Sequence, residues 1–261
     1  MINNQTKIFF SISSNPGNFG AYLYNKAFQE LNIDAIYKPL KLDSKYQLTD
    51  FINLLSVFKI IGTSGLSVSM PFKRYAYLAI RSEDAATEEI GNANTIVFDE
   101  HTSYCYNVDH IGFEKSCYDR LYQQDILDES KSAIIFGKGS VANSIAYVLK
   151  SRNIDFFMTK DPENLINRGI DFLINATPVG MDHIQDDVFN KKIVKDYKFV
   201  FDVVVKKETN LIKLARELNK TYVCGWQMAS KQLTEQFKIY TKKEYPEDLM
   251  NIGLKELGYG Y

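Results

Sequence analysis

The stretch AIIFGKGSVA (residues 133–142), followed by NSIAYVLK (residues 143–150), decides the fold because it is typical of a buried strand, a tight glycine turn and a helix. In this G-x-G-x-x-A pattern Gly137 would make the sharp turn, and Gly139 would let the backbone approach a pyrophosphate. Ala142 is small enough for the helix to pack closely on its strand. The pattern therefore predicts a dinucleotide site.

The N–H groups of the new helix would face the phosphates, which makes Ser140 and Val141 candidate cofactor-binding residues. An isolated G-x-G-x-x-A can also be an ordinary glycine turn. The apolar run before this one and the helical pattern after it favour nucleotide binding.

Alternating strand and helix patterns on both sides of the turn predict an α/β protein. Before the turn, the sequence predicts strands at residues 7–11 and 35–40, helices at 19–31 and 46–58, a strand-like run at 60–73, and a hairpin near 99–103. After it, near-continuous apolar runs at 154–158, 172–176 and 199–205 are typical of buried parallel strands. A helix at 210–218, a strand at 221–224 and a long helix at 227–240 follow.

Composition excludes several classes of function. The 261 residues are 24% charged and 45% apolar with a net charge of −1, so nothing favours nucleic acid or an anionic membrane as a partner. The 3 cysteines form no C-x-x-C pair, which indicates reduced intracellular thiols. Because the sequence also lacks a signal-peptide pattern and an apolar run of membrane-spanning length, we expect a cytoplasmic protein.

The end of the second strand after the turn bears on the choice of cofactor. A carboxylate there would bind the ribose hydroxyl of NAD, whereas a cation would bind the extra phosphate of NADP. Thr159 and Lys160 stand at this place with Asp161 directly behind them. The sequence therefore favours NADP and leaves NAD possible.

Three polar positions before the turn have ordinary explanations when each is taken alone. Lys73, after a strand and Pro71, would be a solvated surface lysine, and Asp109 would be a helix N-cap. The asparagines of GNANT (residues 91–95) would mark a turn.

Six segments together resemble, in order and spacing, the shikimate dehydrogenase family. They are SVSMPFK (67–73), GNANT (91–95), NVD (107–109), the glycine turn, NATPVGM (175–181) and GWQMASKQ (225–232). The resemblance covers nearly the whole chain and is strongest to the divergent shikimate dehydrogenase-like branch.

The resemblance implies an N-terminal α/β substrate domain (residues 1–106 plus 231–261) and a Rossmann-type NADP-binding domain (107–230), with a deep cleft between them. It implies reversible, NADP-dependent reduction of 3-dehydroshikimate to shikimate, an oxidation–reduction at a CH–OH group in chorismate and aromatic amino acid biosynthesis. The expected partner is this small molecule, and the chain would be a monomer or homodimer without a metal.

The resemblance also assigns roles to individual residues. Lys73 would be the acid/base and Asp109 its partner, because hydride transfer to or from a ring carbon requires a proton to move at the oxygen. By the same matching, the substrate would be bound by Asn18, Ser69, Asn94 and Gln232, and the nicotinamide end would be lined by Thr177, Val203 and Gly225.

The sequence departs from the family at two places. Asn18-Phe19-Gly20-Ala21 stands where most members have the Ser-x-Ser-Pro loop that holds the substrate carboxylate, and Val205 replaces a tyrosine. Asn18, or the earlier Ser11 and Ser13, would then bind the carboxylate. The substrate can therefore also be quinate or another cyclic hydroxy acid, and the chain can also be a nucleotide-binding sensor without turnover. A folate dehydrogenase disagrees with the matches at Asn94 and Gln232.

Overall fold

The computed structural model describes residues 3–99, 102–119, 124–166, 169–182, 184 and 188–260. The chain forms two compact units, which we describe separately. The first comprises Met1–Val108 and Leu233–Tyr261, and the second comprises Asp109–Gln232. The expected α/β class is confirmed.

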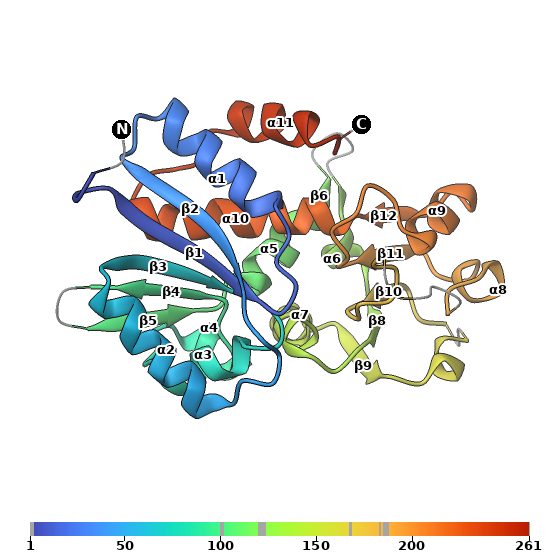
Figure 1. Cartoon of the computed structure of the whole chain (residues 1–261). Coiled ribbons are helices and arrows are strands. Elements are labelled where there is room, and N and C mark those ends of the chain that lie inside the picture. The colour runs from blue at the N-terminus through green and yellow to red at the C-terminus, as the bar shows by residue number, and fades with distance from the viewer. Residues whose placement is uncertain are drawn as a thin grey trace. The chain divides into compact units, whose positions relative to one another are not determined.

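The first unit is built on a five-stranded sheet with the order β2-β1-β3-β4-β5 (Figure 1). Strands β1 (Lys7–Ser13), β2 (Ala35–Lys41) and β3 (Thr63–Val68) are parallel, as the β-α-β-α order predicts. Strands β4 (Thr95–Phe98) and β5 (Ser103–Tyr106) pair as an antiparallel hairpin, and β4 runs antiparallel to its other neighbour, β3. The sheet is thus mixed, and its parallel half ends at one edge.

Helices cover both faces of this sheet because β1 is apolar on both sides. Phe9 packs on Phe28 of α1 (Phe19–Glu30) and Tyr240 of α10 (Gly225–Thr241), whereas Phe10 packs on Phe58 of α2 (Leu48–Ile60). The helices of this unit are α1 (Phe19–Glu30), α2 (Leu48–Ile60), α3 (Lys73–Ala79), α4 (Ala85–Ile90) and α11 (Glu247–Glu256), together with the C-terminal part of α10 (Gly225–Thr241).

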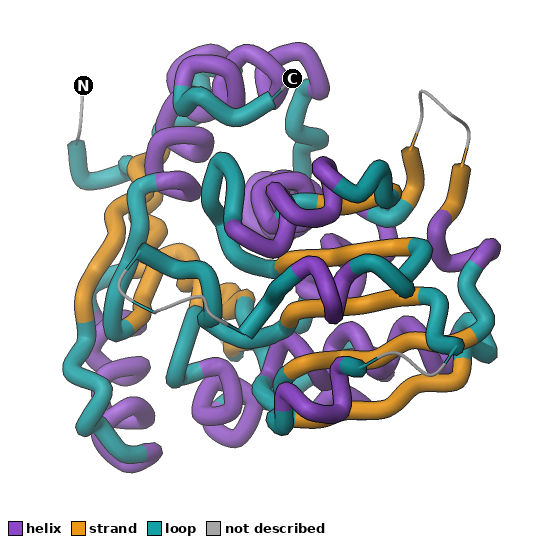
Figure 2. The backbone as a smooth tube through the Cα atoms, turned by 90° about the vertical axis from the view of Figure 1, so that its right-hand side faces the viewer, coloured by secondary structure: helices purple, strands orange, loops and turns teal. Residues whose placement is uncertain are grey.

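The second unit contains a five-stranded parallel sheet with the order β12-β11-β10-β8-β9, whose strands lie side by side in Figure 2. Its strands are β8 (Ser132–Phe136), β9 (Asp155–Thr159), β10 (Phe172–Asn175), β11 (Phe199–Asp202) and β12 (Thr221–Val223). The strand order reverses between β8 and β10, and doubly wound sheets bind their ligands at the carboxyl ends of such strands.

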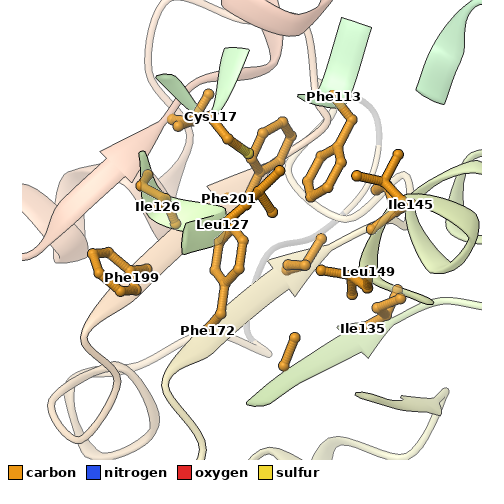
Figure 3. Close-up of a cluster of buried hydrophobic side chains, with 14 of the residues drawn as sticks. Phe113, Cys117, Ile126, Leu127, Ile135, Ile145, Leu149, Phe172, Phe199 and Phe201 are labelled. Atoms are coloured by element: carbon orange, nitrogen blue, oxygen red, sulfur yellow. The ribbon is translucent and has the colours of Figure 1, made fainter. Parts of the chain in front are cut away.

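Helices pack on both faces of the second sheet. On one face Phe113 of α5 (Asp109–Ser116) and Ile145 and Leu149 of α7 (Ser140–Ser151) form a core with Phe172 and Phe201 (Figure 3). The other face buries Leu173 and Val200 under Leu211, Leu214 and Ala215 of α9 (Asn210–Glu217). Shorter elements are β6 (Tyr118–Asp119), β7 (Gln124–Asp125), α6 (Ile126–Glu129), η1 (Pro162–Leu165) and α8 (Lys191–Val194).

Candidate functional site

The glycine turn has the geometry that the sequence predicts. Gly137 has φ +135°, and a Cβ there would lie 2.6 Å from the carbonyl oxygen of Ala176. Its N–H donates to the carbonyl of Thr159 at 2.7 Å, which joins the ends of β8 and β9. A side chain at residue 137 would therefore both strain the backbone and collide with β10.

Gly139 and the start of α7 form a cradle that fits a phosphate. Gly139 is the N-cap residue of α7 in extended conformation, and a Cβ on it would meet no described atom within 4 Å. The first N–H groups of a helix have no intrahelical acceptor, and here they belong to the turn that Ser140 and Val141 open. Open space beside these donors suits a pyrophosphate.

The end of β9 separates the roles of Lys160 and Asp161. The Asp161 carboxylate accepts the backbone N–H of Glu163 at 3.0 Å and so caps the short helix η1. Buried Thr159 accepts the N–H of Asp161 at 3.0 Å and the side-chain amide of Asn164 at 3.1 Å. Lys160 is exposed to solvent. The carboxylate thus has a local structural role, and the exposed cation suits a phosphate.

Thr177, Val203 and Gly225 lie at the same edge of the second sheet as the glycine turn. Thr177 donates its N–H to Oδ1 of Asn175 at 3.1 Å, and the N–H of Val203 donates to the carbonyl of Asn175 at 3.1 Å. A Cβ on Gly225 would lie 2.4 Å from the carbonyl oxygen of Val204. The structure therefore brings the three predicted nicotinamide-end residues together.

Lys73 is a buried lysine at the carboxyl edge of the first sheet. It begins α3, only 6% of it is exposed, and its carbonyl accepts the N–H of Ala93 at 3.0 Å. Lys73 is therefore not the solvated surface lysine that the sequence alone suggested. Lysines are rarely buried without a partner or a function. Its backbone bond to Ala93 holds it next to Asn94.

Asn94 is fully buried and ties three strands together. Its Oδ1 accepts the N–H of Val108 at 3.1 Å and the hydroxyl of Thr95 at 2.9 Å. Its carbonyl accepts the N–H of Val68 at 2.8 Å and the side-chain amide of Gln236 at 3.0 Å. Asn94 is therefore fixed at the point where β3, β4 and the end of β5 meet.

Two further asparagines of this edge were missed as site residues. Asn107 donates its side-chain amide to Oδ1 of Asn92 at 2.8 Å and to the Asn92 carbonyl at 3.1 Å. Its own N–H donates to the hydroxyl of Thr87 at 2.7 Å, and Asn92 and Asn107 are both at most 2% exposed. Both lie in segments that the sequence singles out, but the turn-like pattern of GNANT hid this amide pair.

A cluster of hydroxyls lies beneath the same edge and was also missed. Ser67 Oγ lies 3.1 Å from the hydroxyl of Tyr240 and donates to Oε1 of Gln236 at 3.2 Å. Tyr24 donates to the same Gln236 oxygen at 3.0 Å. Burial raises the pKa of Tyr37 to about 12, so this phenol stays protonated beside Ser67. The sequence carries no periodic signal for such a cluster.

Asn18 and Ser69, the other predicted substrate residues of the first unit, are exposed. Asn18 is the N-cap residue of α1, and its side chain makes no capping hydrogen bond. Ser69 donates its N–H to the carbonyl of Ile12 at 2.9 Å, which places it beside the end of β1.

Asp109 and Gln232 belong to the second unit. Asp109 is 1% exposed and is the first residue of α5, so it is not the N-cap residue considered from the sequence alone. One turn further along α5, a Cβ on Gly112 would lie 3.0 Å from Cβ of Gln232. Asp109 and Gln232 therefore lie on two helices in close contact.

Of the residues that the structure describes, no group of three or more His, Cys, Asp or Glu side chains could hold a metal. Within the described part of the chain no helix is long and apolar enough to cross a membrane.

Residues 19–96 match the family model described as the shikimate dehydrogenase substrate binding domain. The shikimate dehydrogenase-like protein of Haemophilus influenzae is 26% identical over 271 residues, covering 96% of this chain and 96% of the relative. The NADP(+) shikimate dehydrogenase of Aquifex aeolicus is 25% identical and covers 98% of this chain and 99% of its own. The resemblance to the shikimate dehydrogenase family is thereby confirmed.

Solved structures of shikimate dehydrogenases share this fold. The chorismate mutase/shikimate 5-dehydrogenase fusion protein of Clostridium acetobutylicum superposes with a TM-score of 0.85 at 23% identity, covering 97% of this chain and 98% of the other. The Aquifex aeolicus enzyme superposes with a TM-score of 0.83 at 24% identity, covering 98% and 100%. These likenesses extend the match beyond the substrate binding domain to the parallel sheet of the second unit.

Proposed function

We propose that this chain is an NADP-dependent shikimate dehydrogenase that reversibly reduces 3-dehydroshikimate to shikimate. Relatives that match along nearly the whole chain bear the name shikimate dehydrogenase (NADP(+)). The observation that carries the proposal is buried Lys73 beside fixed Asn94 in a unit that matches a shikimate dehydrogenase substrate binding domain.

The two units would divide the work. In this proposal the first unit binds the substrate through Ser69, Asn94 and Asn18, and Gln232 adds an amide from α10. The second unit binds NADP at the glycine turn. The three cysteines are free thiols, which suits the cytoplasmic location that we propose.

Lys73 would move the proton of the reaction. Bound NADP supplies or accepts the hydride. When a ring hydroxyl is oxidised, its proton must leave the oxygen, and an amine that has given up its own proton can accept it. In the reverse direction the ammonium donates the proton to the carbonyl oxygen. Asp109 would orient the ammonium and relay the proton.

NADP is favoured over NAD by the end of β9. The Asp161 carboxylate caps η1 and is therefore engaged locally, whereas Lys160 is exposed. A cation at this place suits the 2′-phosphate of NADP, and an engaged carboxylate is a poor acceptor for a ribose hydroxyl.

A second substrate of the same class is favoured by the loop before α1. Asn18 and Gly20 supply no hydroxyl where the family has serines, and Asn18 is exposed without a capping bond. Quinate, which differs from shikimate in its ring, is therefore the alternative substrate. Absence of turnover would instead favour the nucleotide-binding sensor.

The test is the initial rate of oxidation of shikimate and of quinate, each with NADP and with NAD. We expect shikimate with NADP to give the highest kcat/KM. Faster turnover of quinate would replace the substrate in this proposal but keep the reaction type. If NADP binds and neither acid is oxidised, the dehydrogenase proposal for these substrates is wrong.

A further inference from the structure

Asp202 is a buried carboxylate at the carboxyl end of β11, and its side chain is completely inaccessible to solvent. Its Oδ1 accepts the side-chain amide of Asn175 at 3.0 Å and the N–H of Val204 at 3.1 Å. Its Oδ2 accepts the hydroxyl of Thr209 at 2.6 Å. A buried carboxylate is costly even when it is hydrogen-bonded. The carboxylate therefore needs an explanation beyond packing.

Asp202 fixes the orientation of the Asn175 amide. An ionised carboxylate only accepts hydrogen bonds, so Asn175 must direct its NH2 group toward Asp202 and its oxygen the other way. The NH2 group also donates to the carbonyl of Val179 at 3.0 Å. The oxygen then accepts the N–H of Thr177 at 3.1 Å and the Thr177 hydroxyl at 2.6 Å.

Thr177 in turn holds the loop that follows β10. Its Oγ1 accepts the N–H of Val179 at 3.2 Å, and the carbonyl of Asn175 accepts the N–H of Val203 at 3.1 Å. A chain of hydrogen bonds thus runs from Asp202 through Asn175 to Thr177 and Val179. Every atom in it lies at the carboxyl edge where Gly137 meets β10.

We infer that Asp202 is a positioning residue: through Asn175 it holds Thr177 and the backbone of residues 177–179 in place at the nicotinamide end of the cofactor site. This inference rests on the proposed function, because it takes this edge as the nicotinamide end. Because Asp202 has no exposed surface, it would touch neither the cofactor nor the substrate. Its role is to decide which way a neutral amide points.

The test separates the two ends of the cofactor. The probe 2′,5′-ADP carries the adenosine part and the extra phosphate but no nicotinamide, so it reports only on the end near Lys160. Calorimetry with NADPH and with 2′,5′-ADP would be run on the wild type and on Asp202→Asn. We expect Asp202→Asn to bind NADPH about tenfold more weakly, because the amide of residue 202 no longer fixes Asn175. Binding of 2′,5′-ADP stays unchanged.

A double variant tests whether Asp202 acts through Thr177. Thr177→Val removes the hydroxyl at the end of the chain of hydrogen bonds. If Asp202 works by this route, Asp202→Asn has little further effect on NADPH affinity in the Thr177→Val background. Additive losses would overturn the route through Thr177.

Thr209→Val is the matched control for stability. It removes the hydroxyl bonded to Oδ2 of Asp202 and the cap of α9, but leaves the Asp202–Asn175 bond in place. We expect a lower melting temperature with the ratio of NADPH to 2′,5′-ADP affinity unchanged. The inference is overturned if Asp202→Asn weakens both ligands equally, weakens neither, or if Thr209→Val changes the ratio as much.

Turnover distinguishes this inference from the proposed function. If the wild type oxidises shikimate, kcat of Asp202→Asn should fall between about tenfold and a hundredfold, as expected for a displaced nicotinamide. If the wild type binds both probes without turnover, the proposed reaction fails and the affinity ratio still decides the inference. If the wild type binds neither probe, both are wrong.

Discussion

The carboxyl edges of the two sheets differ in what they present. In the first unit the edge carries buried side chains with functional groups, namely Lys73, Asn94 and Asn107. In the second unit the edge carries glycines and backbone groups, with Gly137 pressed against β10 and Gly225 against the end of β11. Parallel strands end at both edges, yet the first edge carries a buried lysine and buried asparagines, whereas the second has glycines where backbone segments approach closely.

This difference matches the two kinds of ligand that we propose for the chain. Small hydroxylated acids are recognised by amides and by a charged group that can exchange a proton. A pyrophosphate is recognised by backbone N–H groups, which need close approach and therefore glycine. The hairpin β4–β5 supplies the first edge with its asparagines, because Asn94 directly precedes β4 and Asn107 directly follows β5.

Replacing Gly137 should have the largest effect on the second edge. Gly137→Val places a branched side chain at φ +135° with its Cβ 2.6 Å from the Ala176 carbonyl. We expect the free energy of unfolding to fall by at least about 1–3 kcal/mol and NADPH binding to be lost. Urea denaturation and calorimetry measure these. Gly139→Ala is the control for stability, because its Cβ meets open space; equal destabilisation by both would contradict the close contact.

Removing the Lys160 cation should weaken binding of one cofactor only. A charge-assisted hydrogen bond contributes about 1.5–3 kcal/mol, so Lys160→Ala should bind NADP between about tenfold and a hundredfold more weakly. NAD lacks the 2′-phosphate and serves as the internal control, with unchanged affinity. Equal losses of affinity for NADP and NAD would show that Lys160 does not bind the 2′-phosphate.

Asn94 tests the first edge. Asn94→Ala removes the acceptor for the Val108 N–H and the Thr95 hydroxyl, both in a fully buried environment. We expect the free energy of unfolding to fall by about 1–3 kcal/mol and KM for the substrate to rise, while NADPH affinity stays unchanged. Normal stability and a normal KM in this variant would show that Asn94 does not contribute to substrate binding at this edge.

The buried thiols should give the smallest effect and should not distinguish the units. Burial raises the pKa of Cys105 in the first unit and of Cys224 in the second to about 12. An unfolded thiol ionises near pH 8.5, whereas the buried thiol stays protonated at that pH. The contribution of each thiol to the stability of the fold is therefore fully present at neutral pH. This stability is lost as pH rises from about 8.5 towards the folded pKa.

Urea denaturation at pH 8 and pH 9 checks this, with Cys105→Ala and Cys224→Ala as comparisons. The free energy of unfolding of the wild type should fall between pH 8 and pH 9. In each variant this fall should be smaller, by less than about 1 kcal/mol. A stability that does not depend on pH in this range would mean that neither thiol is protected.

Local pattern was enough to predict the second unit. The apolar runs predicted strands, and the glycine turn with Ala142 predicted a turn and a helix. These elements could be predicted because each depends on residues that are neighbours in sequence. The local pattern was misleading where the same apolar residues could belong to a strand or to a helix. The strand-like run from Ile60 begins with the end of α2, where Ile60 is 83% exposed.

Tertiary pairing determined what the sequence could not predict. The Asn92–Asn107 amide pair and the Asp202–Asn175 bond each join residues on different elements. Their geometry depends on strand order, which no periodicity encodes. Lys73 is likewise buried and bonded through its carbonyl to Ala93, which lies just before β4, whereas the segment alone resembled a surface lysine.

The central claim is that the first edge carries the chemistry and the second edge carries the cofactor. Its most direct test is Lys73→Ala, measured in parallel for NADP-dependent shikimate oxidation and for NADPH affinity. We predict that kcat falls by at least about a hundredfold while NADPH affinity stays at the wild-type value. Wild-type kcat in Lys73→Ala, or loss of NADPH binding that accounts for the whole defect, would contradict the division of roles.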